Sequence, residues 1–325
     1  MKFTCDSFFA GVGGIEEGFS EAGFKIIYAN EMDDNAVRTY ELNHSLKVDH
    51  RRIQDVKENE VPSCDVVMGG FPCQAFSVAG YRRGFEDKER GLLFFEMLRF
   101  IRAKGPRVVF CENVKNLVGH DNGNTFRVIK EALEDAGYKV KHAVLNGMDY
   151  GNVPQNRERI YLVGFKNKED YRNFDFPDPI PFTARLEDVI DFHIKVDDKY
   201  YYKKENCSFY KQLCDGIKRK NTVYQWRRVY VRENKSNVCP TLTANMGEGG
   251  HNVPLVLTDH GIRKLTPHEC FNLQGFPETF KLPERMAQTH LYKQAGNSVV
   301  VPVVRRIAEK IKEAMKLADG KKNDR

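Results

Sequence analysis

The chain of 325 residues lacks long apolar runs and any segment that would direct it into a membrane. No stretch of about 18 consecutive apolar residues occurs, so we expect no transmembrane helix. The first six residues carry one lysine and begin no long apolar region, so we expect no secretory signal peptide there.

Paired cysteines are also lacking. None of the eight cysteines is followed by another after two residues, as in the C-x-x-C pairs of structural zinc sites. The same scatter argues against a dense disulfide framework. We therefore expect no metal site, and unpaired cysteines are typical of the reducing cytosol.

Acidic residues are scarce in one segment, although the chain is only mildly basic, with a net charge of +6. Between Lys199 and Lys235 there are eleven Lys and Arg residues against three Asp and Glu residues, so the rest of the chain carries a small net negative charge. Aromatic residues are interleaved with these cations. Cations for phosphates and aromatic rings for bases are typical of nucleic-acid binding. The alternative is a solvated, charged face over a small core.

Apolar residues make up 41% of the chain, enough for a sizeable core in one large domain, or in a large and a small one. The first pattern is a predicted strand, a glycine-rich turn and a helix between Phe8 and Phe19. Glycines let a ligand approach the backbone, and the helix directs N–H groups at the turn. Glu31 ends the next predicted strand, where an acidic side chain can bind ribose hydroxyls. This pattern predicts a nucleoside-bearing cofactor; NAD and FAD, or a turn without any ligand, remain alternatives.

Cys73 follows a short buried strand, Asp65–Met68, and a turn formed by two glycines and a proline. Glu112 follows another predicted strand, Arg107–Cys111. Because the carboxyl ends of parallel strands meet at one edge of a sheet, we expect Cys73 and Glu112 on the same rim. Cys73 is predicted to be a nucleophile, with an inert buried cysteine as the alternative. For Glu112 the alternative is a structural carboxylate in a salt bridge.

Three further segments have distinct compositions. Residues 77–91 are rich in glycine and charge without periodicity, which indicates either a mobile functional loop or a solvated surface loop. Arg157 and Arg159 stand at the start of a predicted strand, where residues two apart can project to the same face. Three prolines between residues 174 and 182 predict an extended linker ahead of the basic segment.

Six motifs, taken in order, resemble those of the DNA (cytosine-5) methyltransferases, especially the compact bacterial enzymes of restriction–modification systems. The match covers nearly the whole chain, and six motifs in this order and spacing are highly specific. The motifs are Phe9-Ala10-Gly11-Val12-Gly13-Gly14, Gly70-Phe71-Pro72-Cys73-Gln74, Glu112-Asn113-Val114, Gln155-Asn156-Arg157-Glu158-Arg159, Arg263-Lys264-Leu265-Thr266-Pro267 and Gly296-Asn297-Ser298.

The resemblance implies an α/β fold with a Rossmann-like methyltransferase domain that uses S-adenosylmethionine. Its sheet is expected to be mixed but mostly parallel, with helices on both faces. Residues 1–182 and 270–325 are expected to form this catalytic and cofactor-binding domain, with the closing helix packing back onto it. Residues 183–269 are expected to form a smaller target-recognition domain. The implied activity is that of a DNA (cytosine-5-)-methyltransferase, with S-adenosylhomocysteine as the second product.

The resemblance also implies a covalent route. C5 of cytosine is a poor nucleophile, and addition of a Cys73 thiolate at C6 makes the ring electron-rich. The thiolate needs positive surroundings, for which Arg157 and Arg159 are the candidates. A carboxyl group at Glu112, with a pKa raised by burial, can share or donate a proton at N3. These four residues are the predicted catalytic set.

The matched positions further imply a cofactor pocket. One position departs from the family, because Arg52 stands where an acidic residue usually bonds the adenine amino group; Asp49 or backbone groups are the candidate replacements. The predicted cofactor-binding residues are Phe9, Gly11, Val12, Gly13, Glu31, Met32, Pro72, Leu93, Asn297 and Ser298.

Contact with DNA is expected at two places. A base inside a duplex hides C5 and C6, so the target cytosine must be flipped out, and the loop after Ser77 is the expected clamp. The loop 236–252 is expected to read base edges in the major groove. The predicted DNA-binding residues are Ser77, Arg82, Arg83, Arg227, Arg228, Arg232, Thr243, Asn245, Gly249 and Gly250.

Three other functions remain open. An RNA cytosine-5 methyltransferase would use the same active site on a tRNA. A nicotinamide dehydrogenase would use the glycine turn but would leave the Pro-Cys-Gln turn and the basic segment unexplained. A non-catalytic DNA-binding relative is disfavoured by the joint presence of Cys73, Glu112 and Arg159. We expect a monomer that acts on double-stranded DNA in the bacterial cytoplasm and protects host DNA beside a cognate restriction endonuclease.

Overall fold

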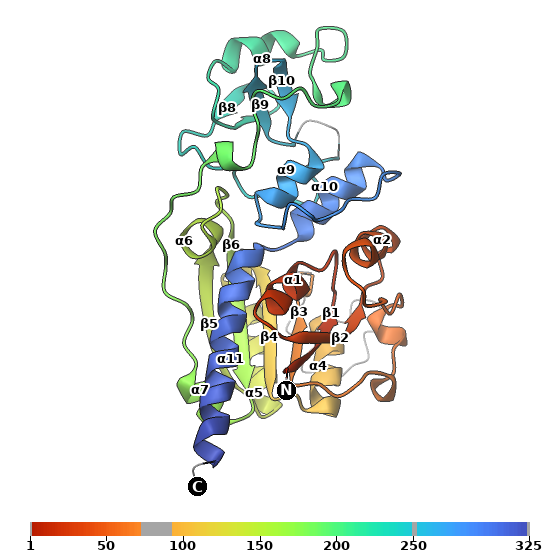
Figure 1. Cartoon of the computed structure of the whole chain (residues 1–325), viewed down its shortest axis with the longest axis vertical. Coiled ribbons are helices and arrows are strands. Elements are labelled where there is room, and N and C mark those ends of the chain that lie inside the picture. Colours follow the sequence, from red (N-terminus) through yellow and green to blue (C-terminus); the bar gives the residue numbers. More distant parts are fainter. Residues whose placement is uncertain (1, 73–92, 249–251, 324–325) are drawn as a thin grey trace. The chain divides into compact units, whose positions relative to one another are not determined.

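The computed structural model describes residues 2–72, 93–248 and 252–323, and the chain forms two compact units (Figure 1). The first unit comprises Met1–Leu145, Glu158–Asp178 and Val303–Arg325. The second comprises Asn146–Arg157 and Pro179–Pro302. The crossing at Asp178 falls inside the linker predicted from its prolines.

The unit boundaries differ from the expected domain boundaries in three places. Asn146–Arg157, residues 179–182 and residues 270–302 group with the second unit, whereas the family resemblance implies that they belong to the catalytic domain. The first of these segments is held by backbone bonds to a residue far along the chain: Asn156 N–H donates to Cys239 O over 2.8 Å, and Cys239 N–H donates to Pro154 O over 2.7 Å. Such long-range pairing leaves no local pattern in the sequence.

A six-stranded sheet forms the centre of the first unit, in the order β2-β1-β3-β4-β6-β5. The pairs β1–β2, β1–β3 and β3–β4 are parallel, and β4–β6 is antiparallel. The predicted mixed, mostly parallel sheet is therefore confirmed. The strands are β1 (Thr4–Phe8), β2 (Lys25–Asn30), β3 (Val66–Gly69), β4 (Val108–Val114), β5 (Lys139–Asn146) and β6 (Glu158–Phe165).

Helices cover both faces of this sheet, and its central strands β3 and β4 are accordingly buried and largely apolar on both sides. Val109 and Cys111 of β4 belong to a core that includes residues of α4 and α5. Phe110, between them, points the other way and meets Phe19 of α1 with ring centroids 5.1 Å apart. The helices are α1 (Gly14–Glu21), α2 (Asp34–Asn43), α4 (Leu93–Lys104), α5 (Asn124–Asp135), α7 (Lys168–Asn173) and α11 (Val301–Asn323), with short 3₁₀ turns η1 (Ile53–Asp55), η2 (Glu58–Glu60) and η3 (Lys115–Val118).

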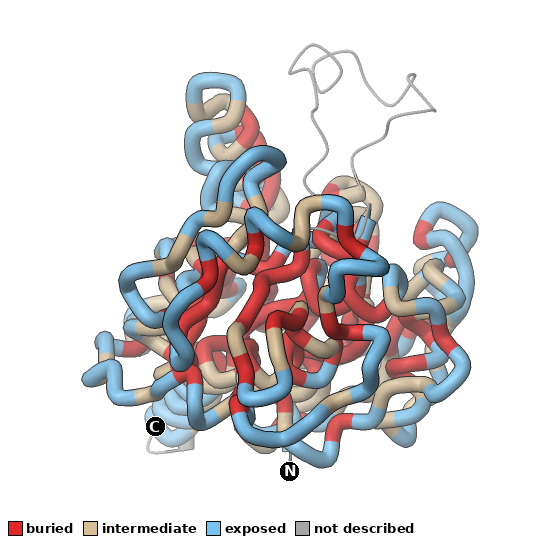
Figure 2. Tube along the Cα trace, turned by 90° about the horizontal axis from the view of Figure 1, so that it is seen from above, coloured by how far each residue is buried: buried red, intermediate tan, exposed pale blue. Residues whose placement is uncertain are grey.

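The β3 strand is buried throughout and ends at a glycine that its neighbours require. A Cβ atom on Gly69 would lie 2.8 Å from Phe8 O and 2.7 Å from the sulfur of Met97. The chain therefore packs β3 tightly between β1 and α4 before it turns at Gly70. In Figure 2 the buried stretches of the chain lie inward of the exposed turns that connect them.

The second unit is built on a smaller, antiparallel sheet of order β10-β9-β7-β8. Its small core gathers Leu213, Ile217, Tyr224, Leu255 and Ile262. The elements are α6 (Gly147–Gly151), η4 (Leu186–Asp188), η5 (Asp198–Tyr200), α8 (Tyr210–Gly216), β7 (Tyr224–Trp226), β8 (Val231–Glu233), β9 (Leu255–Thr258), β10 (Gly261–Lys264), α9 (Pro267–Asn272) and α10 (Gln288–Asn297).

The start of α9 is fixed by residues that are close in sequence. Thr266 is the N-cap and Pro267 occupies the first turn, where its missing N–H costs no hydrogen bond. Glu269 completes a capping box: its N–H donates to Thr266 Oγ1, and its carboxylate accepts the N–H of Thr266.

Candidate active site

Glu112 and Arg159 meet at the carboxyl end of β4. The two strands β4 and β6 are adjacent and antiparallel, with Val114 opposite Arg159, so the arginine side chain reaches back to the carboxylate. Arg159 Nε lies 3.0 Å from Glu112 Oε1, and each side chain is about one-tenth exposed. The sequence places both residues on one rim, and the structure brings them into a buried ion pair.

The turn that leads to Cys73 lies against this pair. A Cβ atom on Gly70 would lie 3.2 Å from Glu112 Oε2, so the backbone of the turn closely approaches the carboxylate. Asn113 Nδ2 donates to Phe71 O over 2.8 Å and holds the turn to the end of β4. Gly70 and Asn113 both stand within the family motifs, but no local pattern in the sequence indicates these contacts.

Several predicted residues lie outside the part of the chain that the structure describes. They are Cys73, Ser77, Arg82, Arg83, Gly249 and Gly250. Their roles stay predictions. Pro72, the last described residue before Cys73, is exposed, and Leu93, at the start of α4, packs partly buried against the sheet core.

Arg157 is placed differently from its prediction. The sequence predicts it beside Arg159 on one strand face, but β6 begins at Glu158 and Arg157 groups with the second unit. Its guanidinium is almost fully buried and donates to three backbone oxygens: Leu242 O and Gly296 O, each at 2.8 Å, and Ser298 O. These contacts tie the guanidinium to the backbone of that unit, and its predicted catalytic role stays a prediction.

Glu31 is held by the backbone on the cofactor side of the predicted site. Its Oε2 accepts the N–H of Gly11 over 2.9 Å, and its Oε1 accepts the N–H groups of Met32 and Asp33, both over 2.8 Å. A carboxylate offers about four acceptor positions, so one remains on Oε2 for a hydroxyl group. The acidic side chain is therefore oriented before any ligand binds.

The turn between β1 and α1 is open above its first glycine. Gly11 has φ +57, and no atom lies within 4 Å of the position that a Cβ would take. Phe9 also has φ +57, a conformation that costs a non-glycine residue about 1–3 kcal/mol. Gly13 caps α1 at φ +91, where a Cβ would overlap the ring of His44. The turn thus leaves room for a ligand at Gly11 and is closed at Gly13.

The remaining predicted cofactor residues fall in different places. Val12 is buried and Met32 is 59% exposed, next to Glu31. Asn297 and Ser298 end α10 in the second unit, and a cofactor contact by either residue stays a prediction.

Asp49 is already committed to other groups. Its carboxylate accepts the Tyr28 hydroxyl over 2.8 Å and two N–H groups of Arg51 over 2.7 Å each. The bonds from Arg51 hold the pKa of Asp49 below its ordinary value. This leaves backbone groups as the better candidates to bond an adenine where Arg52 replaces the usual acidic residue.

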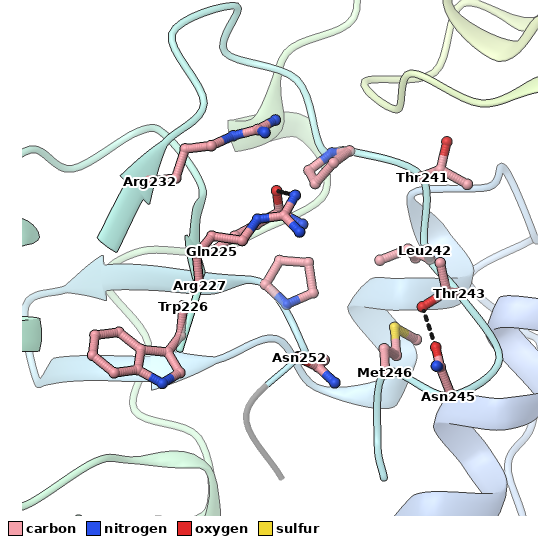
Figure 3. Close-up of a pocket in the computed structure, with 12 residues that line it drawn as sticks. Gln225, Trp226, Arg227, Arg232, Thr241, Leu242, Thr243, Asn245, Met246 and Asn252 are labelled. Carbon is pink, nitrogen blue, oxygen red and sulfur yellow. Dashed lines mark hydrogen bonds between the residues drawn. The ribbon is translucent and has the colours of Figure 1, made fainter. Parts of the chain in front are cut away.

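The second unit contains a pocket of about 430 Å³ (Figure 3). Four predicted DNA-binding residues line it, whereas Arg228, at the hairpin between β7 and β8, is not among the described residues that do. Sequence reasoning missed Gln225 and Thr241. The full lining is Gln225, Trp226, Arg227, Arg232, Pro240, Thr241, Leu242, Thr243, Asn245, Met246, Asn252 and Pro254.

Comparison with known proteins gives consistent matches. The family model described as C-5 cytosine-specific DNA methylase matches residues 3–313. The Type II methyltransferase M.Bsp6I of Bacillus sp. (strain RFL6) is 63% identical over 310 residues, which cover 95% of this chain and 98% of that protein. M.HhaI of Haemophilus parahaemolyticus is 37% identical, with 93% and 92% covered. Among solved structures, the S. pombe Dnmt2 methyltransferase shares the fold, with a TM-score of 0.72, 18% identity, and 97% and 99% covered.

Proposed function

Because the chain belongs to the C-5 cytosine-specific DNA methylase family, we propose that it methylates C5 of a cytosine flipped out of duplex DNA, with S-adenosylmethionine as the donor. The observation that carries the proposal is the buried Glu112–Arg159 pair beside the turn that leads to Cys73. Like its relatives named Type II methyltransferases, it would act within a restriction–modification system and protect cellular DNA, in the cytoplasm, from a partner endonuclease. It would work as a monomer.

In the proposed mechanism the Cys73 thiolate adds to C6 of the cytosine, and the electron pair of the C5–C6 double bond moves toward C5 and N3. Glu112 meets the charge that develops at N3 and shares a proton there. Arg159 binds Oε1 of this carboxylate, which leaves Oε2 on the side of the turn. S-adenosylmethionine, when bound, supplies an activated methyl group for the electron-rich C5. A base then removes the C5 proton, and the electrons of that bond expel the Cys73 thiolate.

The residues of the first unit fit such a donor. The fixed carboxylate of Glu31 has an acceptor position for a ribose hydroxyl, and the space above Gly11 admits a ligand to the backbone. Exposed Met32 offers an apolar surface beside them. Phe9, Pro72, Leu93, Asn297 and Ser298 complete the proposed set.

The second unit is proposed as the target-recognition domain. Its basic segment supplies Arg227, Arg228 and Arg232 for phosphates or guanines, and Thr243 and Asn245 stand on the wall opposite these arginines in Figure 3. The loop after Ser77, which lies outside the described residues, stays the predicted clamp on the DNA.

Mapping methylated cytosines in DNA from cells that express the chain tests this proposal. We expect one cytosine in a fixed sequence context to be converted to 5-methylcytosine, and no conversion by the Cys73→Ser variant. A purified enzyme that labels tRNA but not duplex DNA would replace this function by the RNA methyltransferase alternative. Full activity of Cys73→Ser would refute the covalent route.

A further inference from the structure

One face of the β7–β8 ribbon carries a row of long polar side chains. Gln225 of β7 lies directly opposite Arg232 of β8. Arg227 follows two residues after Gln225 and still pairs with the partner strand, since its N–H donates to Tyr230 O over 2.9 Å. Side chains two residues apart on a strand share a face, so all three project toward the same pocket, as Figure 3 shows.

The opposite face of the ribbon is anchored in the core of the second unit. Tyr224 is fully buried, and Trp226 stacks on Phe209 with ring centroids 4.4 Å apart and planes within 8° of parallel. The indole ring points away from the arginines in Figure 3. The ribbon therefore presents its polar row from a fixed base.

This polar row consists of hydrogen-bond donors. Arg227 Nη2 donates to Gln225 Oε1 over 3.0 Å. A guanidinium has donors only, so the amide oxygen must face it, and the Gln225 NH₂ group is left to donate outward. Among the described residues neither Arg227 nor Arg232 forms an ion pair, so both guanidinium groups can bind a ligand.

The facing wall of the pocket offers acceptors. Thr243 Oγ1 donates its hydrogen to Asn245 Oδ1 over 2.9 Å, and Thr241 Oγ1 donates to Asn156 O over 2.7 Å. With their hydrogens used, both hydroxyl oxygens can only accept from a ligand. The pocket thus has donors on the ribbon side and acceptors on the facing side.

In the major groove only a G·C pair shows two adjacent acceptors, guanine N7 and O6, followed by a donor, the cytosine amino group. An A·T pair alternates acceptor, donor and acceptor and adds a methyl group. We propose that this pocket reads the major-groove edge of a G·C pair in the recognised sequence, with guanine bound by Gln225 and Arg227. The inference rests on the proposed function, because it takes duplex DNA as the substrate.

Duplexes that carry 7-deazaguanine test the inference once the methylated sequence has been mapped. This analogue removes the N7 acceptor and keeps Watson–Crick pairing. For the unaltered enzyme we expect kcat/KM to fall about 10-fold or more when one particular guanine is replaced. In Arg227→Ala, which lowers kcat/KM on the normal duplex, the same replacement should cost less than about 2-fold, because the contact is already lost.

Two further variants make the result specific. Gln225→Glu keeps the shape of the side chain but replaces its donor amide by an acceptor, so it should also lower kcat/KM and shrink the penalty at that guanine. Arg219→Ala removes the same charge from an ion pair with Glu233 in the same unit, and should keep the full penalty. Circular dichroism verifies that each variant is folded.

Two results would overturn the inference: no guanine is sensitive to loss of N7, or Arg227→Ala and Gln225→Glu both retain the full penalty. An unaltered enzyme that methylates no duplex DNA would instead overturn the proposed function.

Discussion

Glu112 and Arg159 are the residues whose geometry bears most directly on the chemistry. Both are about one-tenth exposed, so water screens their interaction poorly. The sequence could predict that they share a rim, because Glu112 stands near the end of one strand and Arg159 near the start of another, and β6 begins at the edge of the sheet where β4 ends. The sequence could not predict two contacts of the turn that leads to Cys73: the hydrogen bond from Asn113 to Phe71 O and the close approach of Gly70 to Glu112. Both contacts depend on the register between β3 and β4, which no local pattern reveals.

Replacement of Glu112 by glutamine should abolish most of the activity. The amide fills the same space but cannot share a proton at N3. We therefore expect kcat, measured in steady-state assays, to fall about 10²- to 10⁴-fold. Glu158→Gln is a matched control, because this glutamate begins the adjacent strand β6 and pairs with Lys115 at the surface. It should remain close to the unaltered enzyme. Retention of normal kcat by Glu112→Gln would remove the carboxyl group from the mechanism.

Asp6 and Glu16 are two other buried carboxyl groups in the first unit, and they make its stability depend on pH. Both are fully buried, and burial raises the pKa of each to about 7. The folded protein therefore keeps protons that the unfolded chain releases between about pH 4 and pH 7. Over that range the free energy of unfolding contributed by these groups falls as pH rises, and above pH 7 it changes no further.

Glu16→Gln should therefore stabilise the protein at pH 8 and have little effect at pH 5. The amide carries no charge to bury, and the expected gain at pH 8 is about 2–3 kcal/mol in urea unfolding. Glu131→Gln, on the exposed face of α5, is the control and should change stability by less than about 0.5 kcal/mol at either pH. An equal effect of Glu16→Gln at both pH values would show that its carboxyl group does not titrate in this range.

At the scale of elements, local patterns predict well where an apolar run, a glycine turn or a helix cap marks the element. The buried strands β3 and β4, the glycine turn before α1, and the capped start of α9 all follow from residues that are close in sequence. The ribbon β7–β8 could not be predicted, because three residues per strand are too few to reveal an alternating pattern. The contacts of Arg157 could not be predicted for a related reason: its acceptors come from residues 242, 296 and 298, which no local pattern connects to it.

Arg157→Ala should destabilise the second unit. The substitution leaves three backbone oxygens of buried segments without their donor, and a hydrogen bond to a charged group contributes about 1.5–3 kcal/mol. We expect a loss of about 3 kcal/mol or more, measured by calorimetry, with faster hydrogen exchange around Leu242 and Ser298. An unchanged melting curve with lost activity would instead support the catalytic role that the sequence suggested.

At the scale of the whole molecule, the chain crosses between its two units four times. The crossings fall after Leu145, Arg157, Asp178 and Pro302. The second unit takes a small piece, residues 146–157, from between β5 and β6, and the family resemblance did not imply this crossing.

A hybrid that exchanges recognition with another family member should therefore respect these crossings. Exchange of residues 146–157 together with 179–302 keeps the backbone pairing of Asn156 with Cys239 inside one parent. We expect this hybrid to have a higher melting temperature, by several degrees, than a hybrid that exchanges residues 183–269 alone. It should also methylate the sequence recognised by the donor of the exchanged unit. Equal melting temperatures would show that the pairing tolerates mixed parents.

The stacked pair of Trp226 and Phe209 has an optical consequence. Trp226 is the single tryptophan of the chain, and it lies on the strand that carries Gln225 and Arg227. Its intrinsic fluorescence therefore reports on the second unit alone, without any added label. A shift in the emission of Trp226 during titration with duplex DNA would report DNA binding at the β7–β8 ribbon, independently of changes in the first unit. Stopped-flow recording of this shift would give the rate of DNA binding at the ribbon for comparison with the rate of methyl transfer.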